Sequence, residues 1–106
     1  MKEITVEELK QKIDKKEPFT FLDVRDLFEA NISNLDIESV QIPVNELSEN
    51  IEKLDPQSEI IVMCRSGNRS ATACERLEEA GFTNVANLKG GINEWARKID
   101  SSLPVY

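Results

Sequence analysis

The sequence has no histidine and only two cysteines, Cys64 and Cys74, which stand ten positions apart. The missing imidazole excludes a Cys–His dyad, a Ser–His–Asp triad and any histidine-ligated metal site. The spacing of the cysteines excludes a CxxC redox pair and a zinc knuckle. A nucleophile in this chain therefore has to be activated by something other than histidine.

Long apolar runs are also missing, since no stretch approaches the roughly 20 residues of a membrane-spanning helix. The first ten residues (MKEITVEELK) are charged and amphipathic, unlike a signal peptide. We therefore expect a cytoplasmic protein with two free thiols and no membrane partner. The charge balance of 13 − 20 = −7 argues against nucleic acid as a partner. The length of 106 residues predicts a single domain over residues 1–106.

Strand and helix patterns alternate along the chain. Apolar, partly β-branched stretches typical of strands occupy residues 19–24, 39–42, 60–63 and 84–88. Helical spacing of apolar residues is seen over 6–15 (after a Thr5–Glu8 capping box), 26–32, 44–54, 71–80 and 92–99. The alternation predicts an α/β fold: a three-layer single domain with a mostly parallel central sheet of about five strands flanked by helices. Ligands of such sheets bind beyond the carboxyl ends of the strands, which directs attention to the residues after 60–63.

The segment Cys64–Ser70 (CRSGNRS) follows that buried strand and precedes a helix. Gly67 permits a turn with positive φ, so that successive loop amides can point inward as an anion nest. The dipole of the following helix is directed at the same place. A sulfur atom at Cys64 would lie in this positive field, which favours the thiolate without any histidine. The alternative is that Cys64 only packs in the core. Core packing alone does not explain why two arginines stand in the small polar loop that follows it.

Four stretches of the chain resemble the rhodanese-like domain family and cover nearly all of it in family order. They are residues 22–29 (LDVRDLFE), 41–47 (QIPVNEL), 64–70 (CRSGNRS), and 81–85 with 88–95 (GFTNV and LKGGINEW). The resemblance implies a thiosulfate sulfurtransferase-like enzyme that uses no metal and no organic cofactor. Such enzymes move sulfane sulfur from thiosulfate or a persulfide donor to a thiophilic acceptor, through a cysteine persulfide.

Carried over by position, the resemblance makes Cys64 the nucleophile and persulfide carrier. Arg65 and Arg69 would contact the small anionic sulfur donor. The persulfide would be cradled by the backbone amides of Arg65, Ser66, Gly67, Asn68, Arg69 and Ser70. The acceptor would be a small thiol or a protein. A non-catalytic rhodanese-like module that binds partners or senses persulfide is the alternative, although such modules often lack the cysteine.

Loop length separates sulfur transfer from phosphatase or arsenate reductase chemistry. Four residues lie between Cys64 and Arg69, whereas cysteine phosphatases place one residue more there. The tighter loop suits a single sulfur atom better than a tetrahedral phosphate, which also needs a bidentate arginine.

The chain departs from the common family pattern over residues 31–40 (NISNLDIESV), where many members carry G-H-I-x-G-A. Here, and at its closing residues 95–100 and 103–106, it is similar to the rhodanese domains fused to E1-like enzymes of molybdopterin and thiamine synthesis. That similarity implies a protein acceptor such as a sulfur-carrier protein.

Several other polar or reactive residues lie near the expected site. For Asp23 and Arg25 we favour a structural ion pair over a role of Arg25 in the potential at the mouth of the site. Cys74 falls on the apolar face of its helix, which favours core packing over a resolving thiol. Lys89 has two interpretations, an attractor of the anionic donor or a surface residue.

Overall fold

The computed structural model describes residues 1–106, which form one five-stranded sheet with every strand pairing parallel. The strands are β1 (Lys2–Ile4), β2 (Thr20–Asp23), β3 (Val40–Gln41), β4 (Ile60–Met63) and β5 (Val85–Leu88). Their order across the sheet is β1-β5-β4-β2-β3. The central position of β4 places the residues after it in the middle of the carboxyl edge of the sheet.

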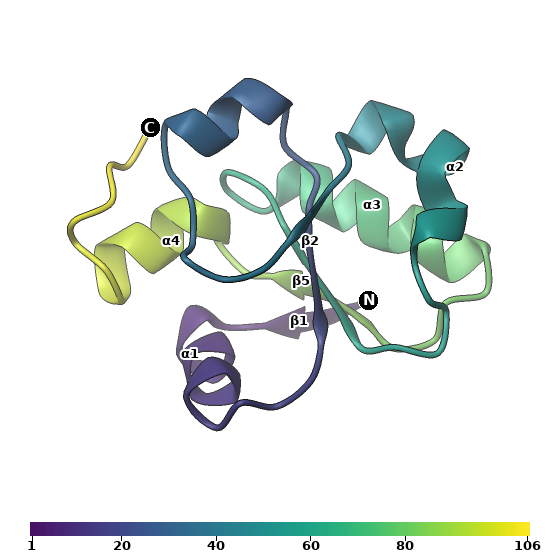
Figure 1. The fold of residues 1–106 in the computed structure, drawn as a ribbon, viewed down its shortest axis with the longest axis horizontal. Coiled ribbons are helices and arrows are strands. Elements are labelled where there is room, and N and C mark those ends of the chain that lie inside the picture. Colours follow the sequence, from purple (N-terminus) through teal and green to yellow (C-terminus); the bar gives the residue numbers. More distant parts are fainter.

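Helices cover both faces of this sheet, which confirms the three-layer α/β fold (Figure 1). One face is covered by α1 (Val6–Asp14) and α4 (Gly91–Lys98), and the other by α2 (Leu47–Asn50) and α3 (Asn68–Glu79). Three short 3₁₀ helices complete the connections: η1 (Leu27–Asn31), η2 (Val44–Glu46) and η3 (Ile51–Lys53). No helix combines the length and the apolar character needed to span a bilayer.

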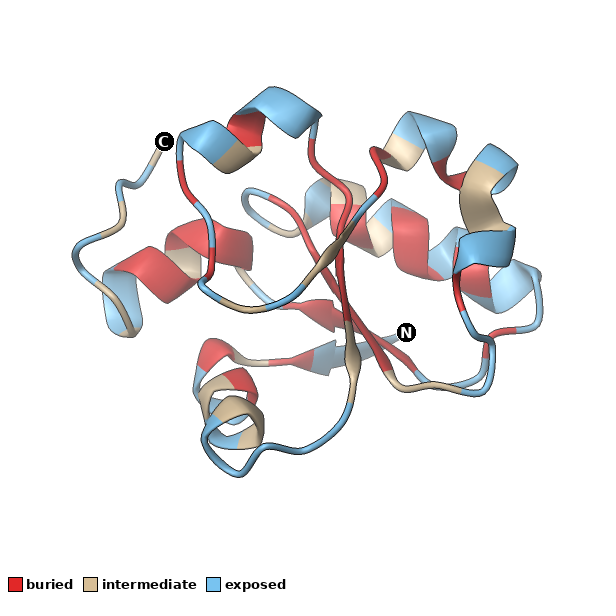
Figure 2. Cartoon of the chain, in the orientation of Figure 1, coloured by how far each residue is buried: buried red, intermediate tan, exposed pale blue.

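Two hydrophobic cores lie on opposite faces of the sheet, and β4 contributes to both. Ile60 and Val62 pack with the α2 and α3 side, whereas Ile61 and Met63 pack with the α1 and α4 side. All four residues are fully buried, as Figure 2 shows for the central strands. A strand enclosed on both faces has no polar side, which explains the unbroken apolar run IIVM.

The predicted helix starts were right at α1 and wrong at α3. Thr5 accepts a hydrogen bond from the Glu8 amide at 3.1 Å, and Glu8 accepts one from the Thr5 amide at 2.9 Å, which confirms the capping box. At α3 the helix begins at Asn68 rather than residue 71. Gly67 adopts φ +109° directly before it, so the chain turns into the helix earlier than the polar sequence indicated.

Two further elements differ from the sequence expectations. β1 was not predicted, because two of its three residues are exposed and charged and it pairs only with β5 at the edge of the sheet. The single helix expected over 44–54 is divided into η2, α2 and η3. None of these short helices has a side-chain cap at its start, which is consistent with the broken helical path.

Candidate active site

Cys64 directly follows the last residue of β4, so its backbone is placed by the most enclosed strand of the sheet. It is 1% exposed and belongs to the core on the α2 and α3 side. Residues 64–67 form a short connection, and α3 begins at the next residue. The structure therefore brings the end of the predicted strand, the turn and the start of α3 together around this sulfur.

Three polar groups lie against the Cys64 sulfur. The amide of Gly67 donates to Sγ at 3.1 Å, and the amide of Ser70 donates at 3.4 Å. The Ser70 hydroxyl oxygen lies 3.2 Å from Sγ. Of the six amides expected to cradle the outer sulfur of a persulfide, these two reach Sγ itself. Backbone N–H groups directed at a sulfur stabilise its anionic form, which is the reactive one.

The start of α4 is hydrogen-bonded to the connection of residues 64–67, which we call the Cys64 loop. The amide of Ile92 donates to the Cys64 carbonyl at 2.9 Å, and the amide of Asn93 donates to the Arg65 carbonyl at 3.1 Å. Gly91 has φ +63°, and a Cβ atom built on it would lie 2.5 Å from the backbone of Cys64 and Arg65. The loop therefore packs directly on the backbone of Gly91, at the start of α4.

Arg69 forms a two-bond ion pair with Glu29 of η1. Its Nη1 and Nη2 atoms donate to the two carboxylate oxygens at 2.7 and 2.9 Å. The hydrogen bonds from Arg69 are the largest reason why the pKa of Glu29 falls from 4.5 to about 2. Glu29 in turn raises the pKa of Arg69. Arg69, which is expected to contact the anionic donor, is therefore already paired with a carboxylate.

Arg65, by contrast, is exposed and forms no salt bridge with an Asp or Glu side chain. Its Nε atom donates to the Tyr106 carbonyl, and its guanidinium lies 5.1 Å from the centre of the Tyr106 ring. A guanidinium at this distance over an aromatic ring is held by a cation–π interaction. Arg65 is thus the loop cation that pairs with Tyr106 and with no Asp or Glu side chain.

Tyr106 links several parts of the site, and sequence reasoning missed it. Its hydroxyl donates to Glu29 at 2.9 Å and accepts from Arg25 Nη1 at 2.9 Å. Its backbone exchanges hydrogen bonds with the Asn93 side chain at 2.8 and 3.2 Å. Burial is the largest cause of the raised pKa of the Tyr106 phenol. Contacts across such long stretches of sequence leave no local pattern by which they could have been predicted.

The structural interpretation of Asp23 and Arg25 is confirmed. Arg25 Nη2 lies 2.8 Å from Asp23 Oδ2, and Arg25 Nε donates to Asp23 Oδ1 at 3.0 Å. The Arg25 side chain is completely buried and also donates to the carbonyls of Glu29 and Ser33. This guanidinium ties β2 to η1 and is not available to a ligand.

Cys74 packs in the same core as Cys64 and forms no disulfide, as expected. Burial raises the pKa of its thiol to about 12. Lys89 is exposed and lines a small hollow with Thr5 and Glu94, among residues outside the Cys64 loop. The burial of Cys74 agrees with core packing, and Lys89 lies at the surface, as one of its two interpretations expects.

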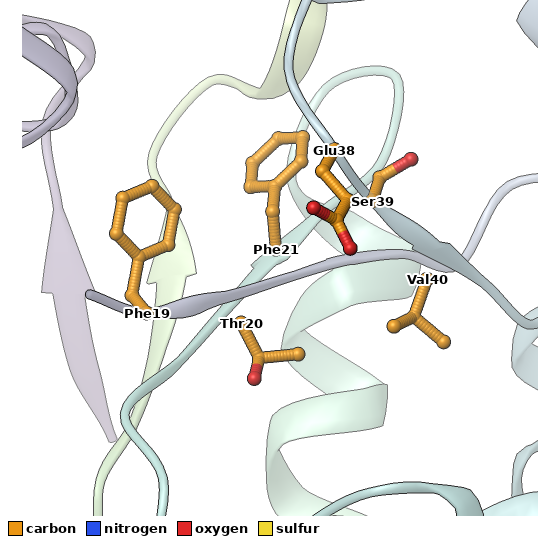
Figure 3. A pocket seen from close by; sticks show the side chains of 6 residues that line it. All are labelled: Phe19, Thr20, Phe21, Glu38, Ser39 and Val40. Atoms are coloured by element: carbon orange, nitrogen blue, oxygen red, sulfur yellow. The ribbon is translucent and has the colours of Figure 1, made fainter. Parts of the chain in front are cut away.

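Two larger hollows also lie apart from the loop. One lies beside the start of β2 and the start of β3 and is lined by Phe19, Thr20, Phe21, Glu38, Ser39 and Val40 (Figure 3). The other, of about 400 Å³, is more apolar and is bordered by Trp95 and Leu103. No residue of the 64–70 segment lines either of them, so we assign them no part in its chemistry.

Comparison with protein families matches residues 5–98 to the Rhodanese-like domain. The Putative sulfurtransferase YtwF of Bacillus subtilis is 37% identical, over 90% of this chain and 90% of its own length. The Adenylyltransferase and sulfurtransferase MOCS3-1 of Zea mays is 36% identical over 97% of this chain. The Putative sulfur carrier protein YrkF of Bacillus subtilis is 34% identical over 92% of this chain. The chain spans only 23% of the maize protein and 52% of YrkF.

Solved structures show the same architecture. A rhodanese-related protein from Thermoplasma volcanium superposes with a TM-score of 0.82 at 34% identity, over 100% of this chain and 98% of its own. A rhodanese-like domain protein from Staphylococcus aureus gives a TM-score of 0.84 at 29% identity, over 100% and 99% of the two chains. The five-stranded fold is therefore shared over its full extent.

Proposed function

The chain belongs to the rhodanese-like domain family, and on that premise we propose that it transfers sulfane sulfur through a persulfide on Cys64. The family and the relatives named sulfurtransferase or sulfur carrier support sulfur transfer as the general activity. The observation that carries the proposal is the pair of amides, from Gly67 and Ser70, that donate to the Cys64 sulfur. A buried cysteine without histidine gains its reactivity from such donors.

In the first half of the reaction, the Cys64 thiolate attacks the outer, sulfane sulfur of thiosulfate. A bond forms between Sγ and that sulfur, and the sulfur–sulfur bond of thiosulfate breaks. Its electron pair leaves with sulfite. In the second half an acceptor nucleophile attacks the outer sulfur of the persulfide, and the bond to Sγ breaks to restore the thiolate. This is covalent catalysis by double displacement, with no net oxidation and no cofactor.

The donor is proposed to be a small anion such as thiosulfate. Arg65 is the loop cation that pairs with no Asp or Glu side chain, and we assign it the first contact with the donor. Arg69 adds positive charge at the start of α3, reduced by its pairing with Glu29. The amides of residues 65–70 are proposed to surround the outer sulfur once the persulfide has formed.

The acceptor is proposed to be a sulfur-carrier protein or a small thiol. The names of YrkF and of the maize MOCS3-1 protein associate similar domains with sulfur carriers and sulfurtransferases. Incubating persulfidated protein with each class of acceptor would separate the two. We place the reaction in a reducing cytoplasm, which is compatible with two free cysteines.

Thiocyanate production from thiosulfate and cyanide tests the proposal. We expect turnover in the wild type, none in Cys64→Ser, and near-normal turnover in Cys74→Ser, the matched control at the other cysteine. Turnover that survives Cys64→Ser would overturn the assignment of the nucleophile. No turnover with thiosulfate or with a persulfide donor would favour the non-catalytic module. Hydrolysis of an aryl phosphate would indicate a phosphatase instead.

A further inference from the structure

Asn87 is a buried polar residue in the middle of an otherwise apolar strand. It belongs to β5, where it is aligned with Val62 of β4 and Glu3 of β1, and it is 4% exposed. An amide side chain in such a place is unfavourable unless both of its ends are hydrogen-bonded. Its partners therefore indicate why an asparagine stands here.

Both ends of the Asn87 amide bind the segment around Cys64. Nδ2 donates to the Gly67 carbonyl at 3.1 Å, and Oδ1 accepts a short hydrogen bond from the Ser70 hydroxyl. Gly67 and Ser70 are the two residues whose backbone amides donate to the Cys64 sulfur. One side chain from a neighbouring strand thus connects the two donors of the sulfur.

The orientation of this amide is determined by its partners. The Gly67 carbonyl can only accept, so the NH₂ group has to face it and the oxygen has to face Ser70. The Ser70 hydroxyl has one proton, and its bond to Asn87 directs that proton away from Cys64. In this arrangement the sulfur receives its hydrogen bonds from the two backbone amides of residues that both bind Asn87.

We propose that Asn87 is a positioning residue that aligns the Gly67 and Ser70 amides on the Cys64 sulfur and thereby stabilises its thiolate. The inference rests on the proposed function of Cys64 as a nucleophile. Asn87 itself makes no hydrogen bond to the sulfur, so its effect is exerted through Gly67 and Ser70.

The rate of Cys64 alkylation by iodoacetamide, followed as a function of pH, tests this role. In Asn87→Ala we expect the midpoint of the profile to move up by about one pH unit, because hydrogen bonds to a charged group are weakened. Below the midpoint the variant then reacts about tenfold more slowly than the wild type, and at high pH the two rates converge. A profile identical to the wild type, or one slowed equally at every pH, would overturn the proposal.

Two further variants distinguish positioning from a general loss of structure. Asn87→Leu removes both hydrogen bonds but keeps much of the side-chain volume, and we expect the same shift as in Asn87→Ala. Asn84→Ala is the matched control, because Asn84 is exposed just before the same strand and its side chain binds Lys2 at 2.7 Å. It should leave the profile unchanged. A shift in Asn84→Ala equal to that in Asn87→Ala would contradict the proposal.

A measurement on the wild type keeps the test independent of how the variants fold. In an NMR titration, the side-chain NH₂ resonances of Asn87 should shift with the same pH midpoint as the alkylation of Cys64. Resonances that do not respond would refute the connection. Neither readout requires a sulfur donor, so a failure of the thiocyanate assay with a positive alkylation result would reject the proposed activity and retain the role of Asn87.

Discussion

Replacing Gly91 with alanine tests whether the close packing of α4 against the Cys64 loop holds that loop in place. Gly91 has φ +63°, a conformation that costs an alanine about 1–2 kcal/mol. The new methyl group would lie 2.5 Å from backbone atoms of both Cys64 and Arg65. Backbone cannot rotate away as a side chain would, and forced shifts of this kind cost about 1–3 kcal/mol. We therefore expect a total destabilisation of about 2–5 kcal/mol.

Gly81→Ala is the matched control for this substitution. Gly81 has φ +98°, but a Cβ atom built on it meets nothing within 4 Å. Its replacement therefore carries the conformational cost alone, about 1–2 kcal/mol. The difference between the two variants isolates the contact between Gly91 and the loop.

Urea unfolding under reducing conditions measures this difference, and the rate of Cys64 alkylation at neutral pH reports on the loop. We expect Gly91→Ala to unfold at a lower urea concentration than Gly81→Ala and to react more slowly, since the amides around the sulfur are displaced. In thermal unfolding the extra cost corresponds to roughly 10 °C. Equal stabilities of the two variants, with equal alkylation rates, would refute the reasoning.

Three further predictions follow from the surroundings of the loop. Because folding lowers the pKa of Glu29 from 4.5 to about 2, the stability it contributes is complete above pH 4.5 and is lost as the pH falls toward 2. Urea midpoints of Glu29→Gln should therefore fall less steeply than those of the wild type over this range, and parallel curves would contradict this. Tyr106→Phe removes the hydroxyl that binds Arg25 and Glu29, and should lower the free energy of unfolding by about 1–3 kcal/mol; an unchanged urea midpoint would argue against it. With its pKa near 12, Cys74 should stay unlabelled when the folded protein is treated with iodoacetamide at neutral pH, and a second label in peptide mass spectra would show otherwise.

The features predicted well from the sequence are those with a local physical signature. An unbroken apolar run predicted β4 with the bounds that the structure shows, and the Thr5–Glu8 spacing predicted the start of α1. The position of the Cys64 loop followed from the same reasoning, because parallel sheets bind ligands at their carboxyl edge. The alternation of strand and helix patterns along the chain was sufficient to predict the α/β architecture.

The features missed are those that depend on partners distant in sequence. The Arg69–Glu29 pair spans 40 positions and the Tyr106–Glu29 bond spans 77. In the sequence, Asn87 is only a polar residue within an apolar strand. Its partners Gly67 and Ser70 lie beside it only in the folded chain. A sequence pattern predicts the position of the Cys64 loop, whereas the groups that contact the loop become visible only through tertiary contacts.

The most direct test of the account is the intact mass of the protein after incubation with thiosulfate or a persulfide donor. We predict the addition of one sulfur atom to the wild type, located on the peptide that contains Cys64 and removed by cyanide. Cys64→Ser should gain no sulfur, and Cys74→Ser should gain it as the wild type does. Sulfur found on Cys74, or no sulfur on either cysteine with every donor, would contradict the central claim that Cys64 is the persulfide carrier.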